Sequence, residues 1–262
     1  MSSSGPEPSV FRQRVRRGQF SGPTGGVCPG YAQANLVAVP REHSSDFLTF
    51  CARNPRACPV IDVTDPGDPT PSWAAPSADL RTDLPSYRVY RGGRLAEERE
   101  SVESLWRPDL VSVLLGCSFT FERALAAAGV PLRHLQLGLT VPMYVTGLAA
   151  RPAGPFSGPV VATMRPIPEP LVSRAVVVTS RFPRAHGAPI HIGDPASIGV
   201  GSLEAPDFGD PVPVKPGEVP VFWACGVTTQ MALAQSGVDL AITHSPGHLF
   251  VTDLLDEELS GV

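Results

Sequence analysis

Apolar residues fall in short runs separated by turn-forming dipeptides, and this pattern predicts a chain of many short elements. The runs at 36–39, 58–63, 110–116 and 219–224 predict buried strands, because they are too continuous for strands with one solvated face. The 30 prolines and 25 glycines recur as PG, GP and GD between these runs, so tight turns connect the elements.

Helical spacing is clearest after Pro40. Apolar residues within 47–51 would share one side of a helix that ends before Pro55, because the residue before a proline disfavours the α conformation. A short basic helix is expected at 8–17, and alternating residues at 86–98 predict a hairpin that turns at two glycines.

Two further runs are rich in β-branched residues. Residues 158–168 and 173–183 predict two strands that pair through the short connection between them. The following stretch to residue 220 is dense in turn residues and lacks helical periodicity.

One segment of the chain occurs twice. Residues 117–130 (CSFTFERALAAAGV) and 225–238 (CGVTTQMALAQSGV) share seven identities in 14 positions without a gap. Each copy follows an apolar strand and precedes a similar short strand, at 143–148 or 249–254. Strand, turn, helix and strand are all duplicated, which predicts parallel βαβ pairing with helices packed outside.

These elements predict an α/β fold with two similar units. Residues 1–150 and 221–262 are expected to form one lobe that contains the repeated strand-turn-helix units. Residues 151–220 would form a smaller, β-rich lobe inserted between them. A chain of 262 residues with 42% hydrophobic content can bury a core in either one domain or two lobes.

Charge and composition favour small-molecule ligands over nucleic acid and membranes. The net charge is −4 and the 21 Lys and Arg residues are dispersed, so no basic field for nucleic acid is expected and small solutes are favoured. No apolar run approaches the roughly 18 residues of a membrane span, and no export signal is evident. The sequence neither indicates nor excludes a homo-oligomer.

The five cysteines form an odd set without CxxC spacing. This pattern argues against a disulfide framework and against a thiolate zinc site, and it favours a reducing cytoplasm.

The turns after the repeated strands are the first candidate for chemistry. In an open α/β sheet, ligands bind where strands lead into helices, and Cys117 and Cys225 both lie at such a point. Backbone N–H groups and the side chains of Ser118, Thr120 and Thr228 could hold an anion there. Two such cradles that face one cleft would hold an acid with two ends.

The thiols and Glu122 have two interpretations each. A cysteine at a helix start can have a lowered pKa and act as a nucleophile, but a buried cysteine is more often a small apolar side chain. Glu122 stands in the first copy where Gln230 stands in the second, so it could be a general base or a solvated residue of the helix face.

Two arginines are candidates for binding a carboxylate. Arg165 and Arg181 each follow a β-rich run, and a planar guanidinium pairs with a carboxylate through two hydrogen bonds. The alternative is an ordinary surface arginine.

Histidines and an aspartate in turns complete the candidate set. His191 and Asp194 could act as acid and base, as a metal site or as turn formers, and their loop context does not match a helical zinc motif. His244 directly follows an apolar run, and its ordinary pKa of about 6.5 suits proton transfer near neutrality. No metal site and no cofactor are expected.

Seven longer motifs together resemble a known family. They are GPTGGVCPGYAQANLV, GCSFTFE, MRPIP, TSRFPRAHGAPIHIGDPASIG, PDFGD, GEVPVFWACGVT and ITHSPGHLFVTD. The chain is similar over nearly its whole length to the hydro-lyase family, also called the D-glutamate cyclase family.

The resemblance implies a fold and two activities. It implies a three-layer αβα lobe beside a smaller two-layer α/β lobe, and removal of water from a small acid. A related mitochondrial protein with a second domain is linked to closing D-glutamate into 5-oxoproline. The family offers no catalytic assignment that could be carried over to this chain.

One motif departs from the family. Relatives tend to read MYRTN where this chain reads MYVTG at 143–147, so Val145 and Gly147 replace two polar residues near the expected cleft. A less polar substrate would follow, with Tyr144 of the same segment as a binding candidate.

These observations favour a cofactor-independent hydro-lyase that acts on a small carboxylate. Arginines and helix starts would hold the acid, His191 or His244 would move protons, and Glu122 or Asp194 would assist. A D-glutamate cyclase is the alternative within enzymes, and a non-catalytic protein that binds a small acid is the alternative outside them.

Overall fold

The structure is a computed structural model that describes residues 5–261. The helices are α1 (Pro8–Arg16), α2 (Arg41–Arg53), α3 (Glu122–Ala127), α4 (Arg133–Leu137), α5 (Val172–Ser180) and α6 (Thr228–Ser236). The strands are β1 (Tyr31–Pro40), β2 (Val60–Val63), β3 (Tyr87–Arg91), β4 (Arg94–Arg99), β5 (Leu110–Gly116), β6 (Met143–Ala149), β7 (Pro159–Pro168), β8 (His191–Ile192), β9 (Glu218–Ala224), β10 (Ala241–His244) and β11 (Phe250–Leu255).

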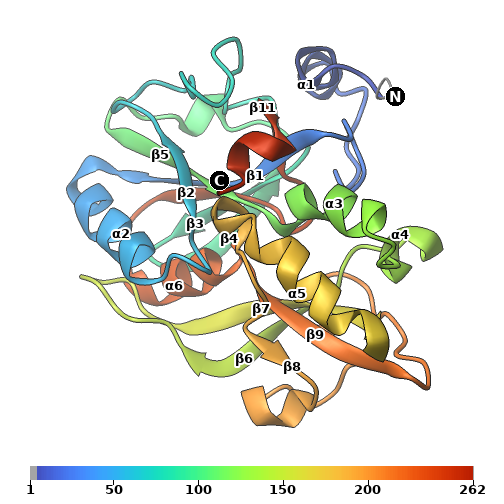
Figure 1. Cartoon of the computed structure of the whole chain (residues 1–262). Helices are drawn as coiled ribbons and strands as arrows, with labels where there is room; N and C mark the ends of the chain where they lie inside the picture. Colours follow the sequence, from blue (N-terminus) through green and yellow to red (C-terminus); the bar gives the residue numbers. More distant parts are fainter. Residues whose placement is uncertain (1–4, 262) are drawn as a thin grey trace.

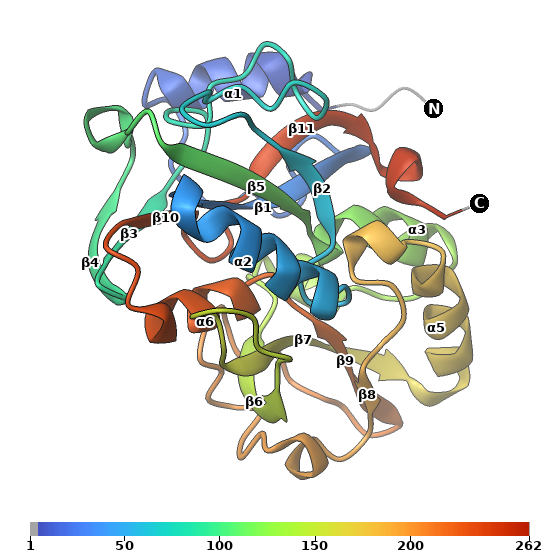
Figure 2. The same ribbon diagram turned by 90° about the vertical axis from the view of Figure 1, so that its left-hand side faces the viewer.

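Two antiparallel sheets form the molecule. The seven-stranded sheet has the order β2-β5-β1-β10-β3-β4, with β11 also paired to β1, and the four-stranded sheet has the order β6-β7-β9-β8. Every strand pair in both sheets is antiparallel. The large sheet lies above the small one in two perpendicular views (Figures 1 and 2).

Strand β1 organises the large sheet because both of its faces are buried. Ala34, Leu36 and Ala38 pack into one apolar cluster, and Val37 and Val39 pack into another on the opposite face. This alternation follows from the two-residue period of a strand.

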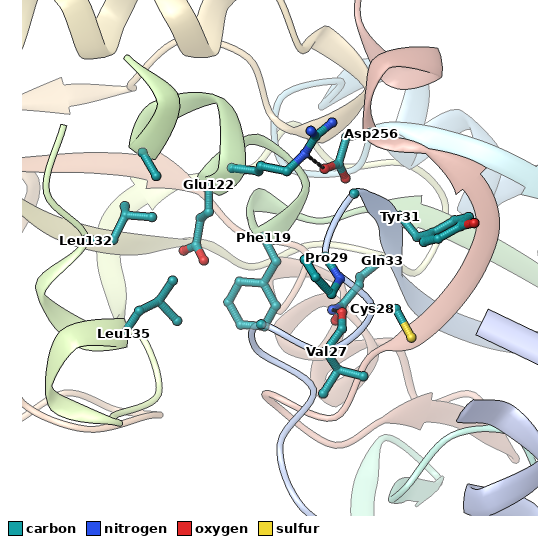
Figure 3. A pocket seen from close by; sticks show the side chains of 14 residues that line it. Val27, Cys28, Pro29, Tyr31, Gln33, Phe119, Glu122, Leu132, Leu135 and Asp256 are labelled. Carbon is teal, nitrogen blue, oxygen red and sulfur yellow. Dashed lines mark hydrogen bonds and ion pairs between the residues drawn. The ribbon is translucent and has the colours of Figure 1, made fainter. Parts of the chain in front are cut away.

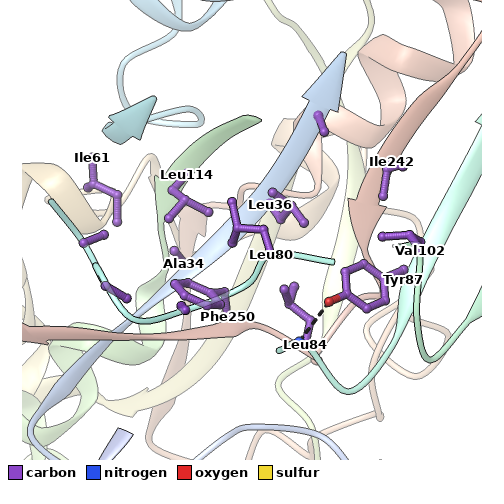
Figure 4. Packing of buried hydrophobic residues seen from close by; sticks show 14 of the residues in the cluster. Ala34, Leu36, Ile61, Leu80, Leu84, Tyr87, Val102, Leu114, Ile242 and Phe250 are labelled. Carbon is purple, nitrogen blue, oxygen red and sulfur yellow. Dashed lines mark hydrogen bonds between the residues drawn. The ribbon is translucent and has the colours of Figure 1, made fainter. Parts of the chain in front are cut away.

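The two faces of the large sheet are covered differently. On one face, Leu80 and Leu84 of the irregular segment before β3 pack with Leu36, Tyr87 and Phe250 (Figure 4). On the other face, α2 contributes Phe47 and Phe50 and α6 contributes Ala232 and Leu233. Helix α6 also contacts β7 of the small sheet, so it packs between the two sheets.

Most elements that the apolar runs predict are confirmed. The first two helices, a strand at each of the four apolar runs and the hairpin of β3 and β4 are all present. The expected burial of the run at 58–63 is wrong, because Val60 and Val63 of the edge strand β2 are exposed. The first copy of the repeat begins with a short 3-10 helix, Ser118–Phe121, which continues into α3, and Gly129 follows it with a left-handed φ of 77°. The α/β class is confirmed.

Two predictions about the sheets are wrong. Residues 172–180 form the helix α5 instead of a strand, because Ala175 and Thr179 on one face of this segment pack inward against the small sheet and α3. Parallel βαβ pairing is absent from the described residues, because the strand after each repeated helix joins the other sheet.

Each copy of the repeat therefore crosses between the sheets, in opposite directions. The first begins in the large sheet with β5 and ends in the small sheet with β6. The second begins in the small sheet with β9 and ends in the large sheet with β10 and β11. The proposed division into 1–150 with 221–262 and 151–220 stays a prediction, although β6 and β9 both pair with β7 in the small sheet.

Candidate functional site

A small cavity, called the inner cavity below, lies where the two copies of the repeat meet. It is lined by Asn35, Cys117, Ser118, Phe119, Val141, Met143, Thr163, Cys225, Val227, His244, Gly247 and Leu249. These residues come from both sheets and from both repeated turns. The space that a water-sized sphere can reach inside is about 20 Å³, enough for one water molecule.

The two repeated turns have matching local structure. The backbone N–H of Thr120 donates to the carbonyl of Cys117 at 3.1 Å, and the N–H of Thr228 donates to that of Cys225 at 3.0 Å. The second turn also passes very close to β1, since a Cβ on Gly226 would lie 2.3 Å from Cγ of Asn35. The sequence prediction that Cys117 and Cys225 approach one pocket agrees with this arrangement.

Both thiols are protonated rather than activated. Burial raises the pKa of Cys225 to about 11 and raises that of Cys117 further, despite the nearby N–H groups. A protonated thiol is a poor nucleophile. The geometry therefore favours the packing interpretation of the two cysteines.

His244 is the most distinctive polar residue of the inner cavity. The side chain at the end of β10 is fully buried, and its Nδ1 lies 3.4 Å from the carbonyl oxygen of Leu36, to which it donates in the tautomer that leaves Nε2 unprotonated. No described residue gives its Nε2 a hydrogen-bond partner. Burial lowers the pKa of His244 to about 4, so the imidazole is neutral near pH 7.

Ser118 faces the inner cavity with a buried arginine behind it. Nη2 of Arg165 donates to Oγ of Ser118 at 3.1 Å, and Nη1 donates to Oγ1 of Thr163 at 3.2 Å. Because the arginine occupies an acceptor site of the serine, the hydroxyl hydrogen remains available to donate.

Arg165 is held by an ion pair. Its side chain is 1% exposed, Nε donates to Oε1 of Glu122 at 3.1 Å, and its guanidinium lies over the rings of Phe121 and Trp223. Burial would raise the pKa of Glu122, but the charge of Arg165 and the contact with His134 hold it below its ordinary value. Glu122 is thus ionised and paired, which differs from a free general base.

His134 and Asn35 are residues that sequence reasoning missed. Nε2 of His134 lies 2.9 Å from Oε1 of Glu122, although the two atoms lack the alignment of a hydrogen bond. Asn35 donates through Nδ2 to the carbonyls of Leu115 and Gly116, and it lines the inner cavity. A polar residue at the edge of the apolar run 36–39 was the one available signal for Asn35.

Three expected site residues lie away from the inner cavity. His191 is on β8, with Nε2 2.7 Å from the carbonyl oxygen of Asp194, and Asp194 caps a short turn of 3-10 helix. Arg181 is exposed after α5, so the premise that it follows a strand is wrong. None of the three lines the inner cavity.

Three other expected residues are engaged in the fold. Oγ1 of Thr228 accepts from the N–H of Val161 at 2.9 Å, and Oγ1 of Thr120 accepts from the N–H of Gln33 at 3.4 Å. The hydroxyl of Tyr144 donates to the carbonyl of Leu203 at 2.8 Å. Their substrate contacts stay a prediction.

The described residues offer neither a metal-binding cluster nor a helix that could cross a membrane. No group of three or more His, Cys, Asp and Glu side chains within residues 5–261 has an arrangement that could hold a metal ion. None of the helices in that range has the length and apolarity that a membrane crossing needs.

The chain closely resembles several bacterial proteins over nearly its full length. It is 56% identical to a protein of Stutzerimonas stutzeri over 96% of this chain and 95% of that protein. It is 57% identical to a protein of Rubrobacter xylanophilus over 97% of this chain and 98% of that protein. A protein of Saccharopolyspora erythraea is 56% identical over 96% of this chain and 98% of its own length. All three bear the name "Putative hydro-lyase".

A family match covers the part of the chain that builds most of the inner cavity. Residues 111–253 match the family described as D-glutamate cyclase, from β5 to β11. Of the residues that line the inner cavity, only Asn35 lies outside this range. With this match and relatives above 50% identity over almost the whole chain, the protein belongs to the D-glutamate cyclase family.

Proposed function

We propose that this protein is a hydro-lyase that removes water from a small carboxylate without a cofactor. The names of the relatives support this reaction class. The observation that supports the proposal is the inner cavity, which the neutral imidazole of His244 and Ser118 line together.

In this proposal, Ser118 and Arg165 recognise the acid. The serine hydroxyl donates to the substrate carboxylate, and Arg165 keeps the serine in that orientation through the bond to its Oγ. Because Glu122 neutralises Arg165, the serine hydroxyl rather than a net positive charge would bind the carboxylate. A polarised carboxylate makes the neighbouring C–H more acidic.

His244 would carry the proton. Its Nε2 removes the proton from the carbon beside the carboxylate, the electron pair forms the C=C bond, and the C–O bond breaks. The imidazolium then protonates the departing hydroxide, so water leaves and His244 returns to its neutral form. One residue would serve as base and then as acid.

The size of the inner cavity limits the substrate. About 20 Å³ does not accommodate a whole carboxylic acid beside its lining, so the surrounding side chains have to move when the substrate enters. Phe119 is the candidate for this movement, because it is only half-buried and lines the inner cavity and the larger pocket on its other side.

A product assay tests the reaction class. The purified chain is incubated with a panel of small hydroxy acids, and products are followed by mass spectrometry and by alkene absorbance. The proposal expects loss of 18 mass units together with new alkene absorbance for at least one acid. Thermal stabilisation by acids without any product would instead identify a binding protein.

The family match favours a second candidate, the cyclisation of D-glutamate. In that reaction, the amine attacks the side-chain carboxyl and water leaves, while no C=C bond forms. D- and L-glutamate in the same panel separate the two candidates, because 5-oxoproline also shows loss of 18 mass units but gives no alkene absorbance.

A further inference from the structure

A second pocket, called the outer pocket below, lies beside Phe119 (Figure 3). Its volume is about 210 Å³, and much of its wall is apolar, with Val27, Ala126, Leu132 and Leu135. Polar groups enter the wall from Gln33, Glu122, Arg123 and Asp256. His244 does not line the outer pocket.

Gln33, a residue of the pocket wall, has an acceptor of fixed orientation. The residue is 3% exposed, and its Nε2 donates to the carbonyls of Thr24 at 2.8 Å and Val27 at 3.2 Å. Turning the amide over would place Oε1 against these two carbonyl oxygens, so the hydrogen bonds fix its orientation. Within residues 5–261, Oε1 has no hydrogen-bond donor.

Asp256 presents a second acceptor. It is 5% exposed, and its Oδ2 accepts from Nε of Arg123 at 3.2 Å. No donor among the described residues reaches its Oδ1. Burial raises the pKa of Asp256 to about 6, against the opposing effect of Arg123.

Glu122 adds a carboxylate at the other side of the pocket. The hydrogen bonds that it accepts from Arg165 all end on Oε1. Figure 3 shows its carboxylate directed toward the space between Leu132, Leu135 and Phe119. Among the described residues, the buried side-chain atoms of the wall without a partner are thus acceptors, and Arg123 is the one cation.

Buried acceptors without donors destabilise a protein, and native proteins usually satisfy them. A ligand that fits this wall has to bring N–H or O–H donors and an apolar body. A carboxylate would meet acceptor oxygens and be repelled. The chemistry is therefore opposite to that proposed for the inner cavity.

We propose that the outer pocket binds a small primary ammonium ion with a short apolar chain. The ammonium group has three donors and no acceptor, which suits Gln33 Oε1 and the carboxylate of Asp256. The alkyl chain packs on Leu132 and Leu135.

Calorimetric titration of the full chain with butylammonium at pH 7.5 tests the proposal. Saturable binding of butylammonium is expected, with 1-butanol and butyrate binding at least about tenfold more weakly. Absence of saturable butylammonium binding overturns the proposal, and so does equal binding of 1-butanol, which would indicate an apolar pocket only.

Asp256→Asn keeps the shape of the side chain and removes its charge. It should weaken butylammonium binding at least about tenfold. Glu204→Gln, the same change at an exposed carboxylate outside the pocket, should leave the affinity unchanged. Equal affinity of Asp256→Asn and the unchanged chain would contradict the proposal, provided that circular dichroism shows both folded.

This site and the proposed reaction can fail separately. His244→Gln removes the proposed base but no residue of the outer pocket, so its butylammonium affinity should stay unchanged while turnover is lost. Parallel loss of butylammonium binding in this variant would place the ammonium in the inner cavity instead and overturn the assignment to the outer pocket.

Discussion

Burial shifts the pKa values of three side chains around the inner cavity. It lowers the pKa of His244 to about 4 and raises the pKa values of Cys117 and Cys225. Near pH 7, a neutral imidazole therefore lies beside two neutral thiols. The imidazole is the only one of these three groups that is ready to accept a proton.

The first prediction concerns the pH dependence of turnover. His244 acts as a base only while neutral, so kcat/KM should stay constant from pH 8 down to about 5 and fall as pH drops through about 4. An acidic limb near 6.5 would contradict a buried base. Below its ordinary pKa, His244 is protonated in the unfolded chain while it stays neutral in the folded one, so the folded state loses stability as pH falls. Circular dichroism at each pH is the control.

The thiols give a second prediction. Because burial raises the pKa of Cys225 to about 11, Cys225→Ala should keep turnover within a few-fold of the unchanged chain. Iodoacetamide should modify the folded chain far more slowly than the unfolded one at pH 7.5. Fast modification with loss of turnover would restore the nucleophilic interpretation.

The sequence could identify the repeated turns but not every residue around them. Cys117, Cys225 and Ser118 follow from the repeat, and His244 follows from its place after an apolar run. His134 has no signal in the sequence, because its contact with Glu122 depends on how α4 packs. Arg181 and His191 were indistinguishable from site residues until their surroundings were known.

Among the elements, α5 is the clearest failure of local pattern. Its three consecutive valines have strand propensity, yet one face packs on the small sheet through Ala175 while Val177 is 55% exposed. Packing of a whole helix face outweighs the propensity of its individual residues. The apolar runs of β1, β5 and β9 were predictable because burial on both faces leaves little alternative.

The structure of α5 leads to a third prediction. Val177→Ala should stabilise the protein by about 0.5 kcal/mol, because alanine favours an exposed helical position more than valine does. Urea unfolding measures the change in the free energy of unfolding. Val176→Ala, at a partly buried position of the same helix, is the comparison. A loss of stability for Val177→Ala would indicate a strand.

The ion pair between α3 and β7 supports a fourth prediction. Glu122→Gln removes the charge that compensates the buried Arg165, so the free energy of unfolding should fall by about 3 to 5 kcal/mol. Glu204→Gln is the exposed control. Equal stability of both variants in urea would show that solvent reaches Arg165.

At the scale of the whole molecule, the repeat explains where the inner cavity lies. Each copy starts in one sheet and ends in the other, so the two turns come together between the sheets. The sequence could not reveal this crossing, because a strand that follows a helix fits a parallel neighbour in one sheet as well as a partner in another. Pairing between distant segments decides which sheet each strand joins.

In the proposed reaction, dehydration takes place in the inner cavity, with His244 as the base. Product formation is measured for the unchanged chain, for His244→Gln and for His43→Gln. His43 is the control, because its partly exposed side chain lies on α2, away from the inner cavity. Turnover should fall at least about a hundredfold in His244→Gln and stay unchanged in His43→Gln. Full turnover of a folded His244→Gln variant, with loss in His191→Gln instead, would contradict it.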